Sequence, residues 1–190
     1  LGLGTYESIK GNINGLGKDG VVEALPYLIK NTEYLMSEED AENIDFKDKK
    51  VVVLGGGDTA MDCVRTAIRQ QAKSVYCVYR RDKENMPGSV KEIKHAMEEG
   101  VEFLFNSQPL EIIGNGTVKQ LKIGKTKLGK ADSTGRRKPV LIKNSEKILD
   151  VDKLVIAFGY EADPQSFIAE NNIKVSDRGL ISLDNENYKY

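Results

Sequence analysis

The stretch Lys50-Val51-Val52-Val53-Leu54-Gly55-Gly56-Gly57-Asp58-Thr59-Ala60 decides the fold of this chain. Its first five residues form an apolar run rich in β-branched side chains, which predicts a strand buried in a parallel sheet. From Asp58 to Gln70 small and apolar side chains recur on one helical face, so we expect a helix directly after the glycines. Residues 74–79 predict a second strand. The three elements form a βαβ unit of about 30 residues with a right-handed crossover.

The three glycines and the start of the helix form a candidate phosphate-binding turn. Gly55 permits the tight turn, Gly57 lets the backbone approach a pyrophosphate, and Ala60 lets the helix pack closely on the strand. Free N–H groups and the positive dipole end of the helix favour an anion there. Asp58 either stabilises the first helical turn or contacts the cofactor. A plain connection between strand and helix is the alternative interpretation. The expected binding residues are Gly55, Gly56, Gly57, Asp58, Thr59 and Ala60.

A second stretch, Gly15-Leu16-Gly17-Lys18-Asp19-Gly20, matches the same glycine pattern literally. It follows the polar residues 10–14, and no strand is predicted ahead of it. Because the motif binds nucleotides only between a strand and a helix, we expect a flexible turn here.

The end of the second predicted strand bears on which nucleotide is bound. In this fold an acidic residue there binds the ribose 2′-hydroxyl of NAD, but here the strand ends in Tyr79-Arg80-Arg81. Two guanidinium groups suit a 2′-phosphate through charge-assisted hydrogen bonds, so NADPH is favoured over NADH. Asp82 weakens this argument, and two arginines on a solvated loop are the alternative.

The second half of the chain predicts a change from helices to antiparallel strands. Ser89 and Glu92 form a capping box for a helix that stops at Gly100, and a third strand follows at 101–105. A β-meander is expected from strands at 110–113, 118–123 and 140–143, before a buried strand at 154–158. The basic segment 124–138 is expected to be a solvated loop, with a docking patch as the alternative. The predicted fold class is α/β: a Rossmann-like, doubly wound parallel sheet with an antiparallel β-meander crossover.

Composition argues against several classes of function. The chain has 28 basic and 29 acidic residues, so its net charge of -1 gives no general attraction to nucleic acid or to membranes. Two cysteines and one histidine offer too few ligands for a metal site, and no Ser/His/Asp or Cys/His set is available for catalysis. No apolar run is long enough for a membrane helix, and a cytoplasmic location is expected. The chain begins with Leu1, so it is expected to be a piece of a longer protein.

Residues 50–89 closely resemble the NADPH-binding domain of the small (β) subunit of bacterial glutamate synthase. More distantly, the chain resembles the electron-entry part of dihydropyrimidine dehydrogenase and the NADPH domain of thioredoxin reductase. The segments that carry the resemblance are Val51–Leu54, Gly55–Thr66, Tyr79–Asp82 and Glu84–Ser89. It continues through Gly2–Tyr6, Ala24–Pro26, Glu99–Phe103 and Ala157–Gly159, so it covers essentially the whole chain.

The resemblance implies a flavoprotein in which NADPH gives hydride to FAD, and electrons pass through iron-sulfur clusters to the large subunit, which makes glutamate from glutamine and 2-oxoglutarate. It implies that Ala157, Phe158 and Gly159 lie beside the bound nucleotide. It also implies three parts: residues 1–45 as a remnant of the FAD-binding domain and linker, 46–160 as the NADPH-binding domain, and 161–190 as the start of the return into the FAD domain. A cysteine cluster and a second glycine motif for FAD are missing from this chain.

The sequence therefore predicts a domain that binds NADPH without turnover by itself. One alternative is the NADPH-entry domain of a related flavin oxidoreductase, of the dihydropyrimidine dehydrogenase or thioredoxin reductase type. The latter needs a dithiol shortly before the glycine strand, and residues 31–50 contain no cysteine. The other alternative is a non-catalytic module that senses NADP(H).

Overall fold

The computed structural model describes residues 5, 7–36, 44–131, 137–162, 168, 170–176 and 179–182. The chain groups into two compact units. The central unit is Lys10–Phe158, and the terminal unit consists of Leu1–Ile9 and Gly159–Tyr190. All candidate nucleotide-binding residues except Gly159 belong to the central unit.

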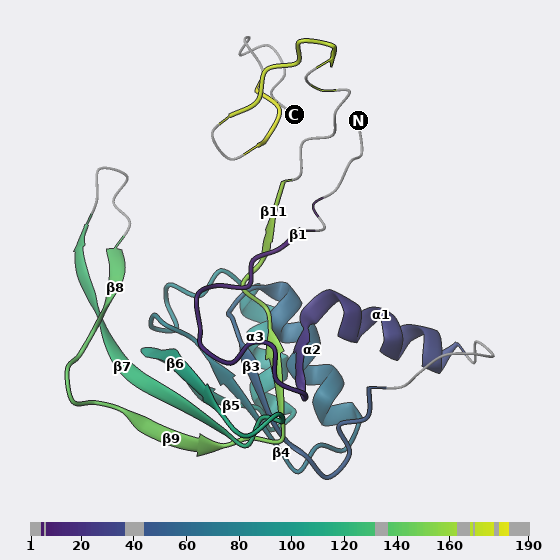
Figure 1. Ribbon diagram of the computed structural model, residues 1–190, viewed down its shortest axis with the longest axis vertical. Helices are drawn as coiled ribbons and strands as arrows, with labels where there is room; N and C mark the ends of the chain where they lie inside the picture. Colours follow the sequence, from purple (N-terminus) through teal and green to yellow (C-terminus); the bar gives the residue numbers. More distant parts are fainter. Residues whose placement is uncertain are drawn as a thin grey trace. The chain divides into compact units, whose positions relative to one another are not determined.

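A five-stranded parallel sheet, in the order β2-β10-β3-β4-β5, is the middle layer of the central unit. Three helices cover one face, and an antiparallel sheet covers the other (Figure 1). The predicted α/β class, with a parallel sheet and a meander, is confirmed. The strands are β2 (Val21–Glu23), β3 (Lys50–Leu54), β4 (Ser74–Val78), β5 (Glu102–Leu104) and β10 (Lys153–Ile156), and the helices are α1 (Ala24–Leu35), α2 (Asp58–Arg69) and α3 (Val90–Glu98).

Strand β3 shows why an unbroken apolar run is needed at the centre of this sheet. Successive side chains of a strand point to opposite faces. Val51 and Val53 therefore pack among the helices, whereas Val52 and Leu54 pack against the antiparallel sheet. All four are fully buried.

The antiparallel sheet is built around one long strand. Strand β7 (Gln120–Ala131) pairs with β6 (Ser107–Ile113), β8 (Arg137–Leu141) and β9 (Lys147–Asp150). The expectation of a loop at 124–138 is wrong for most of that segment, because Gly124–Ala131 continue β7 and Arg137–Lys138 begin β8. Residues 132–136 lie outside the described part of the chain. The paired ends of β7 and β8 are held by backbone hydrogen bonding, for example between Lys127 and Val140. They lack the buried apolar face by which a strand is recognised in a sequence.

The N-terminal segment contributes a strand and a helix to the central unit. Strand β2 pairs in parallel with β10, and α1 packs beside α2 on the helical face. Ala24 and Tyr27 are the buried residues of α1, and the Tyr27 ring stacks on Phe46 at a centroid distance of 4.5 Å. Pro26 lies in the first turn of α1, where its missing N–H costs little.

In the terminal unit, β1 (Glu7–Ser8) pairs antiparallel with β11 (Tyr160–Glu161). The Ile9 N–H donates a hydrogen bond to the Gly159 carbonyl at 3.0 Å. Across all the described ranges of the chain, no helix is long and apolar enough to cross a membrane. Within those same ranges, His, Cys, Asp and Glu side chains form no group of three suited to a metal ion.

Candidate nucleotide site

The candidate site lies at the carboxyl edge of the parallel sheet. Strands β3, β4 and β10 end in register, since Leu54 pairs with both Val78 and Ile156. The next residue of each strand is also held at this edge: the Gly55 N–H donates to the Val78 carbonyl, and the Ala157 N–H to the Leu54 carbonyl. The sheet thus brings together the glycine turn, the arginine segment after β4 and Ala157. Open α/β sheets bind ligands at this edge.

The three glycines of the turn have different surroundings. A Cβ atom at Gly55 would lie 2.1 Å from the Ala157 carbonyl oxygen, and the φ angle of +149° is one that side chains rarely adopt. A Cβ atom at Gly56 would lie 2.5 Å from the Tyr79 ring. A Cβ atom at Gly57 would meet no atom within 4 Å. Gly55 and Gly56 are therefore required by the protein's own packing, whereas Gly57 borders open space.

The N-terminus of α2 has donors available at that open space. Gly57 is the N-cap residue, and no side chain caps the helix. The first N–H groups of an α-helix have no partner within the helix, so those of Asp58 and Thr59 remain for a ligand. The Ala60 and Met61 N–H groups already donate to the Gly57 carbonyl. Ala60 is fully buried, which lets α2 approach the sheet closely. These features fit a pyrophosphate bound through backbone N–H groups.

Asp58 has a partner that the sequence did not indicate. Its Oδ1 accepts a hydrogen bond of 2.7 Å from the Ser89 N–H, at the start of α3. The neighbouring Gly88 N–H donates to the Gly56 carbonyl at 2.9 Å. The carboxylate of Asp58 therefore ties the loop before α3 to the glycine turn. No local sequence pattern predicts this hydrogen bond, because it joins residues 31 positions apart.

The predicted capping box at Ser89 and Glu92 is only half correct. Ser89 is the N-cap of α3, but its side chain makes no capping hydrogen bond. Glu92 instead binds the Arg65 guanidinium on α2. A charged partner offers a carboxylate a stronger hydrogen bond than a backbone N–H does. The Asp58 carboxylate meets the Ser89 N–H in place of the box.

The two arginines after β4 lie in different environments. Arg80 is exposed, and its guanidinium makes no hydrogen bond or ion pair with the described residues. Arg81 is half-buried: its Nε donates to the Tyr79 hydroxyl at 3.1 Å, and its guanidinium lies 5.9 Å from the centre of that ring. The Tyr79 hydroxyl in turn donates to the Asn85 carbonyl. Arg80 is therefore free to bind an anion, whereas Arg81 is already oriented by a tyrosine that also packs on Gly56.

The third candidate segment follows β10. Ala157 is buried and packs against Gly55 through its backbone. The Phe158 ring packs on the core beneath the antiparallel sheet and lies 3.1 Å from where a Cβ atom of Gly11 would be. Gly159 has a φ angle of +98° and belongs to the terminal unit. The contacts of Ala157 and Phe158 support the structure of the central unit.

Neither cysteine is suited to nucleophilic chemistry. Burial raises the pKa of the Cys63 thiol, and it raises the pKa of the Cys77 thiol to about 12. The Cys77 thiol donates to the Gly55 carbonyl at 3.3 Å. Only a thiolate is an effective nucleophile, so both groups act here as apolar packing.

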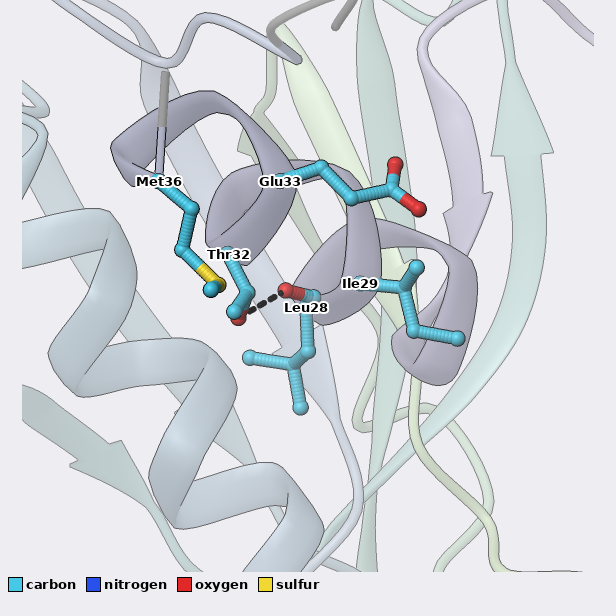
Figure 2. Close-up of a pocket in the computed structure, with 5 residues that line it drawn as sticks. All are labelled: Leu28, Ile29, Thr32, Glu33 and Met36. Carbon is cyan, nitrogen blue, oxygen red and sulfur yellow. Dashed lines mark hydrogen bonds between the residues drawn. The ribbon is translucent and has the colours of Figure 1, made fainter. Parts of the chain in front are cut away.

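A hollow of about 270 Å³ lies on the surface of α1 (Figure 2). Leu28, Ile29, Thr32, Glu33 and Met36 line it. The Thr32 hydroxyl donates to the Leu28 carbonyl, and the charged group among these five is a carboxylate. A lining of this kind cannot hold phosphates.

The second glycine stretch forms the predicted turn. Residues 15–20 lead into strand β2 rather than a helix, and the Lys18 N–H donates to the Gly15 carbonyl. Gly15 is required by close packing, since a Cβ atom there would lie 2.5 Å from the Ile112 carbonyl oxygen.

Comparison with known proteins places this geometry in a family. The model of the pyridine nucleotide-disulphide oxidoreductase family matches residues 7–188. The chain belongs to this family.

Relatives of known name include proteins much longer than this chain. The chain is 48% identical over 186 residues to the glutamate synthase (NADPH) small chain of Escherichia coli K12, a match that covers 95% of this chain and 39% of the relative. It is 45% identical to the protein of the same name from Halomonas elongata, with 98% and 40% covered. It is 44% identical to the putative oxidoreductase AegA of E. coli K12, with 100% and 30% covered. The chain spans two fifths or less of the length of these three relatives.

Solved structures share the fold at low sequence identity. FprA of Mycobacterium tuberculosis in complex with NADPH superposes with a TM-score of 0.69 at 16% identity, and 86% of this chain and 50% of that chain are covered. The thioredoxin reductase of T. acidophilum superposes with a TM-score of 0.67 at 22% identity, with 95% and 50% covered.

Proposed function

We propose that the central unit binds NADPH at the carboxyl edge of its parallel sheet, as the nucleotide-binding part of a flavoprotein oxidoreductase of the glutamate synthase small-subunit type. The observation that carries the proposal is the uncapped N-terminus of α2 beside the open space at Gly57. The pyrophosphate would accept hydrogen bonds from the first N–H groups of α2, with Gly56, Thr59 and Ala60 shaping the turn. The names of the longer relatives, which specify NADPH and glutamate synthase, support the choice of nucleotide and of enzyme.

Bound NADPH supplies a hydride, and the chain supplies position and charge. Gly57 lets the phosphates approach the backbone, and the Asp58–Ser89 hydrogen bond keeps that carboxylate engaged at the start of α3, so that its charge is partly offset near the anion. Arg80 would provide a mobile guanidinium for the 2′-phosphate, and Arg81 an oriented one. Ala157 and Phe158 would border the nucleotide through their backbone at the neighbouring strand end.

In the whole protein, the hydride acceptor would be FAD bound outside the described central unit, with iron-sulfur clusters carrying electrons to a large subunit. The first residues and residues 161–190 would belong to the FAD domain. The expected cytoplasmic location remains a prediction. A thioredoxin-reductase-like activity is less well supported, since Cys63 on α2 and Cys77 on β4 are buried and form no disulfide.

The test compares NADPH and NADH by calorimetric titration of the purified chain. Replacing Arg80→Ala and Arg81→Ala together should weaken NADPH binding by about ten- to hundredfold and leave NADH binding little changed, because NADH has no 2′-phosphate. The matched control is Lys49→Ala with Lys73→Ala, which removes two exposed positive charges at the amino edge of the same strands. The control should keep the NADPH preference. Equal affinities of the unmodified chain for NADPH and NADH would overturn the proposal.

A further inference from the structure

The arginine segment after β4 is held by its backbone carbonyl groups. The Tyr79 carbonyl accepts a hydrogen bond of 3.0 Å from the Ser107 N–H, and the Arg81 carbonyl accepts one of 2.9 Å from the Asn106 N–H. Between them, the Arg80 carbonyl accepts a hydrogen bond of 2.8 Å from the Thr126 hydroxyl. Three successive carbonyl groups are thus fixed by residues that come after β5.

Thr126 differs from the other two donors because it acts through its side chain. It lies in β7 and is 5% exposed, so its hydroxyl is shielded from water. Its own N–H donates to the Asn106 carbonyl at 2.9 Å, which links it to the residue that holds Arg81. The antiparallel sheet therefore contacts the carboxyl edge of the parallel sheet, where it fixes the backbone of both arginines.

We propose that Thr126 is a positioning residue for nucleotide selectivity: by holding the Arg80 carbonyl it fixes the backbone from which Arg80 and Arg81 project toward the 2′-phosphate of NADPH. This inference rests on the proposed function. Strand β4 ends at Val78, so the sheet itself does not hold Arg80. An exposed arginine side chain has many rotamers, so it loses conformational entropy when it binds a ligand. A mobile backbone beneath the side chain would increase that entropy loss. Together with the bonds to the Tyr79 and Arg81 carbonyls, the Thr126 hydrogen bond restricts that backbone freedom before the nucleotide binds.

Two substitutions separate the hydroxyl from the shape of the side chain. Thr126→Val keeps the volume and removes the donor, and it should weaken NADPH binding by about three- to tenfold while changing NADH binding by less than about twofold. Thr126→Ser keeps the donor and should restore the NADPH:NADH affinity ratio to that of the unmodified chain. Both affinities are measured by calorimetric titration. The ratio is insensitive to partial unfolding, because unfolded chains lower the apparent binding of both nucleotides equally.

Ser107→Ala is the matched control. The Ser107 hydroxyl is also buried and donates to the Phe105 carbonyl, but the bond from Ser107 to Tyr79 uses the backbone N–H and survives the substitution. Ser107→Ala should lower the melting temperature without changing the affinity ratio. A Thr126→Val chain that keeps the full NADPH preference, while Arg80→Ala with Arg81→Ala loses it, would overturn the role of Thr126 and leave the proposed function standing. An unmodified chain with no preference would instead refute the proposed function.

Discussion

The three glycines of the turn differ in how their surroundings restrict substitution. Gly55 is required because the Ala157 carbonyl lies too close for a side chain, and Gly56 because the Tyr79 ring lies against it. A Cβ atom at Gly57 would meet no protein atom within 4 Å. Packing therefore does not account for the lack of a Cβ atom at this position, which is in keeping with the proposed nucleotide site.

Gly57→Val should fold and lose nucleotide binding. The φ and ψ angles of Gly57, -89° and 178°, are accessible to valine, and the added atoms meet no protein atom. We expect a loss of stability of roughly 1 kcal/mol, since valine is a poorer N-cap than glycine. Affinity for both NADPH and NADH should fall more than about tenfold, because the pyrophosphate is common to both. Calorimetric titration and thermal melting of the same sample measure the two effects.

Gly55→Ala, two positions earlier in the same turn, is the matched comparison. Its methyl group would collide with the Ala157 carbonyl, so we expect a loss of roughly 1–3 kcal/mol of stability or more. Gly55→Ala should thus lose mainly stability, whereas Gly57→Val should lose mainly nucleotide binding. A folded Gly57→Val chain that binds NADPH normally would refute the assignment of this turn.

The sequence indicates some of these residue roles and misses others for a physical reason. The glycines and Ala60 are recognisable because strand, turn and helix are adjacent in the chain. The Asp58–Ser89 bond and the packing of Tyr79 on Gly56 depend on how separate segments meet. Asp58 had two open roles in the sequence, and the structure shows a third: it holds the start of α3.

At the scale of elements, helices α2 and α3 are joined by an ion-pair network. The Arg65 guanidinium binds Glu92 and Glu99 of the α3 segment, and Arg69 also binds Glu99 at 3.1 Å. The Arg65 and Glu99 side chains are 18% and 27% exposed, so water screens this pair only in part. The Asp58–Ser89 hydrogen bond joins the same two helices at the carboxyl edge of the sheet. The network and this bond together hold α2 and α3 next to each other beside the candidate site.

Arg65→Met should destabilise the chain and change its acid sensitivity. The hydrogen bond from Arg65 holds the pKa of Glu99 below its ordinary value of 4.5. A carboxyl group with a lowered pKa in the folded state contributes stability above its unfolded pKa, and that contribution is lost as the pH falls through the folded pKa. We therefore expect Arg65→Met to cost about 1–2 kcal/mol at pH 7 and progressively less below about pH 4.

Urea unfolding at a series of pH values measures this difference. The control is Lys94→Met, which removes a single exposed ion pair to Glu98 at 3.5 Å on α3. An exposed pair contributes little, so this variant should stay within about 0.5 kcal/mol of the unmodified chain at every pH. An Arg65→Met penalty that does not shrink in acid would show that packing, rather than charge, is what Arg65 supplies.

The sequence predicts the elements that have a local signature. β3, α2 and β4 agree with expectation to within one residue at each end, because the apolar run, the glycines and the helical period are contiguous. β2 could not be recognised, since a three-residue strand is defined by its pairing with β10, more than 130 positions away. The sequence predicts a loop at 124–138 because the residues between its first three lysines are glycine, threonine and a single leucine, which form no apolar face, and the strands β7 and β8 are revealed there by their backbone pairing.

At the scale of the whole molecule, the chain spans two fifths or less of the three relatives described above. Within the described residues, the candidate site of the central unit has features that suit a nucleotide. Among the described residues there is one glycine turn set between a strand and a helix, and the proposed NADPH site uses it. Cys63 and Cys77 are too few for the four thiolates of an iron-sulfur cluster.

The 190-residue chain alone should therefore bind NADPH and remain colourless and without turnover. Hydride transfer needs both reactants held together, and orientation cannot accelerate a reaction whose second reactant is not bound. The purified chain should show no visible flavin absorbance and should not reduce an artificial dye with NADPH.

A longer polypeptide that also carries the FAD-binding segments should be yellow and should reduce the dye. The Gly57→Val substitution in that longer polypeptide should abolish dye reduction while the flavin colour persists, because it blocks the nucleotide and not the flavin. Stoichiometric FAD bound to the 190 residues alone would contradict this division of roles.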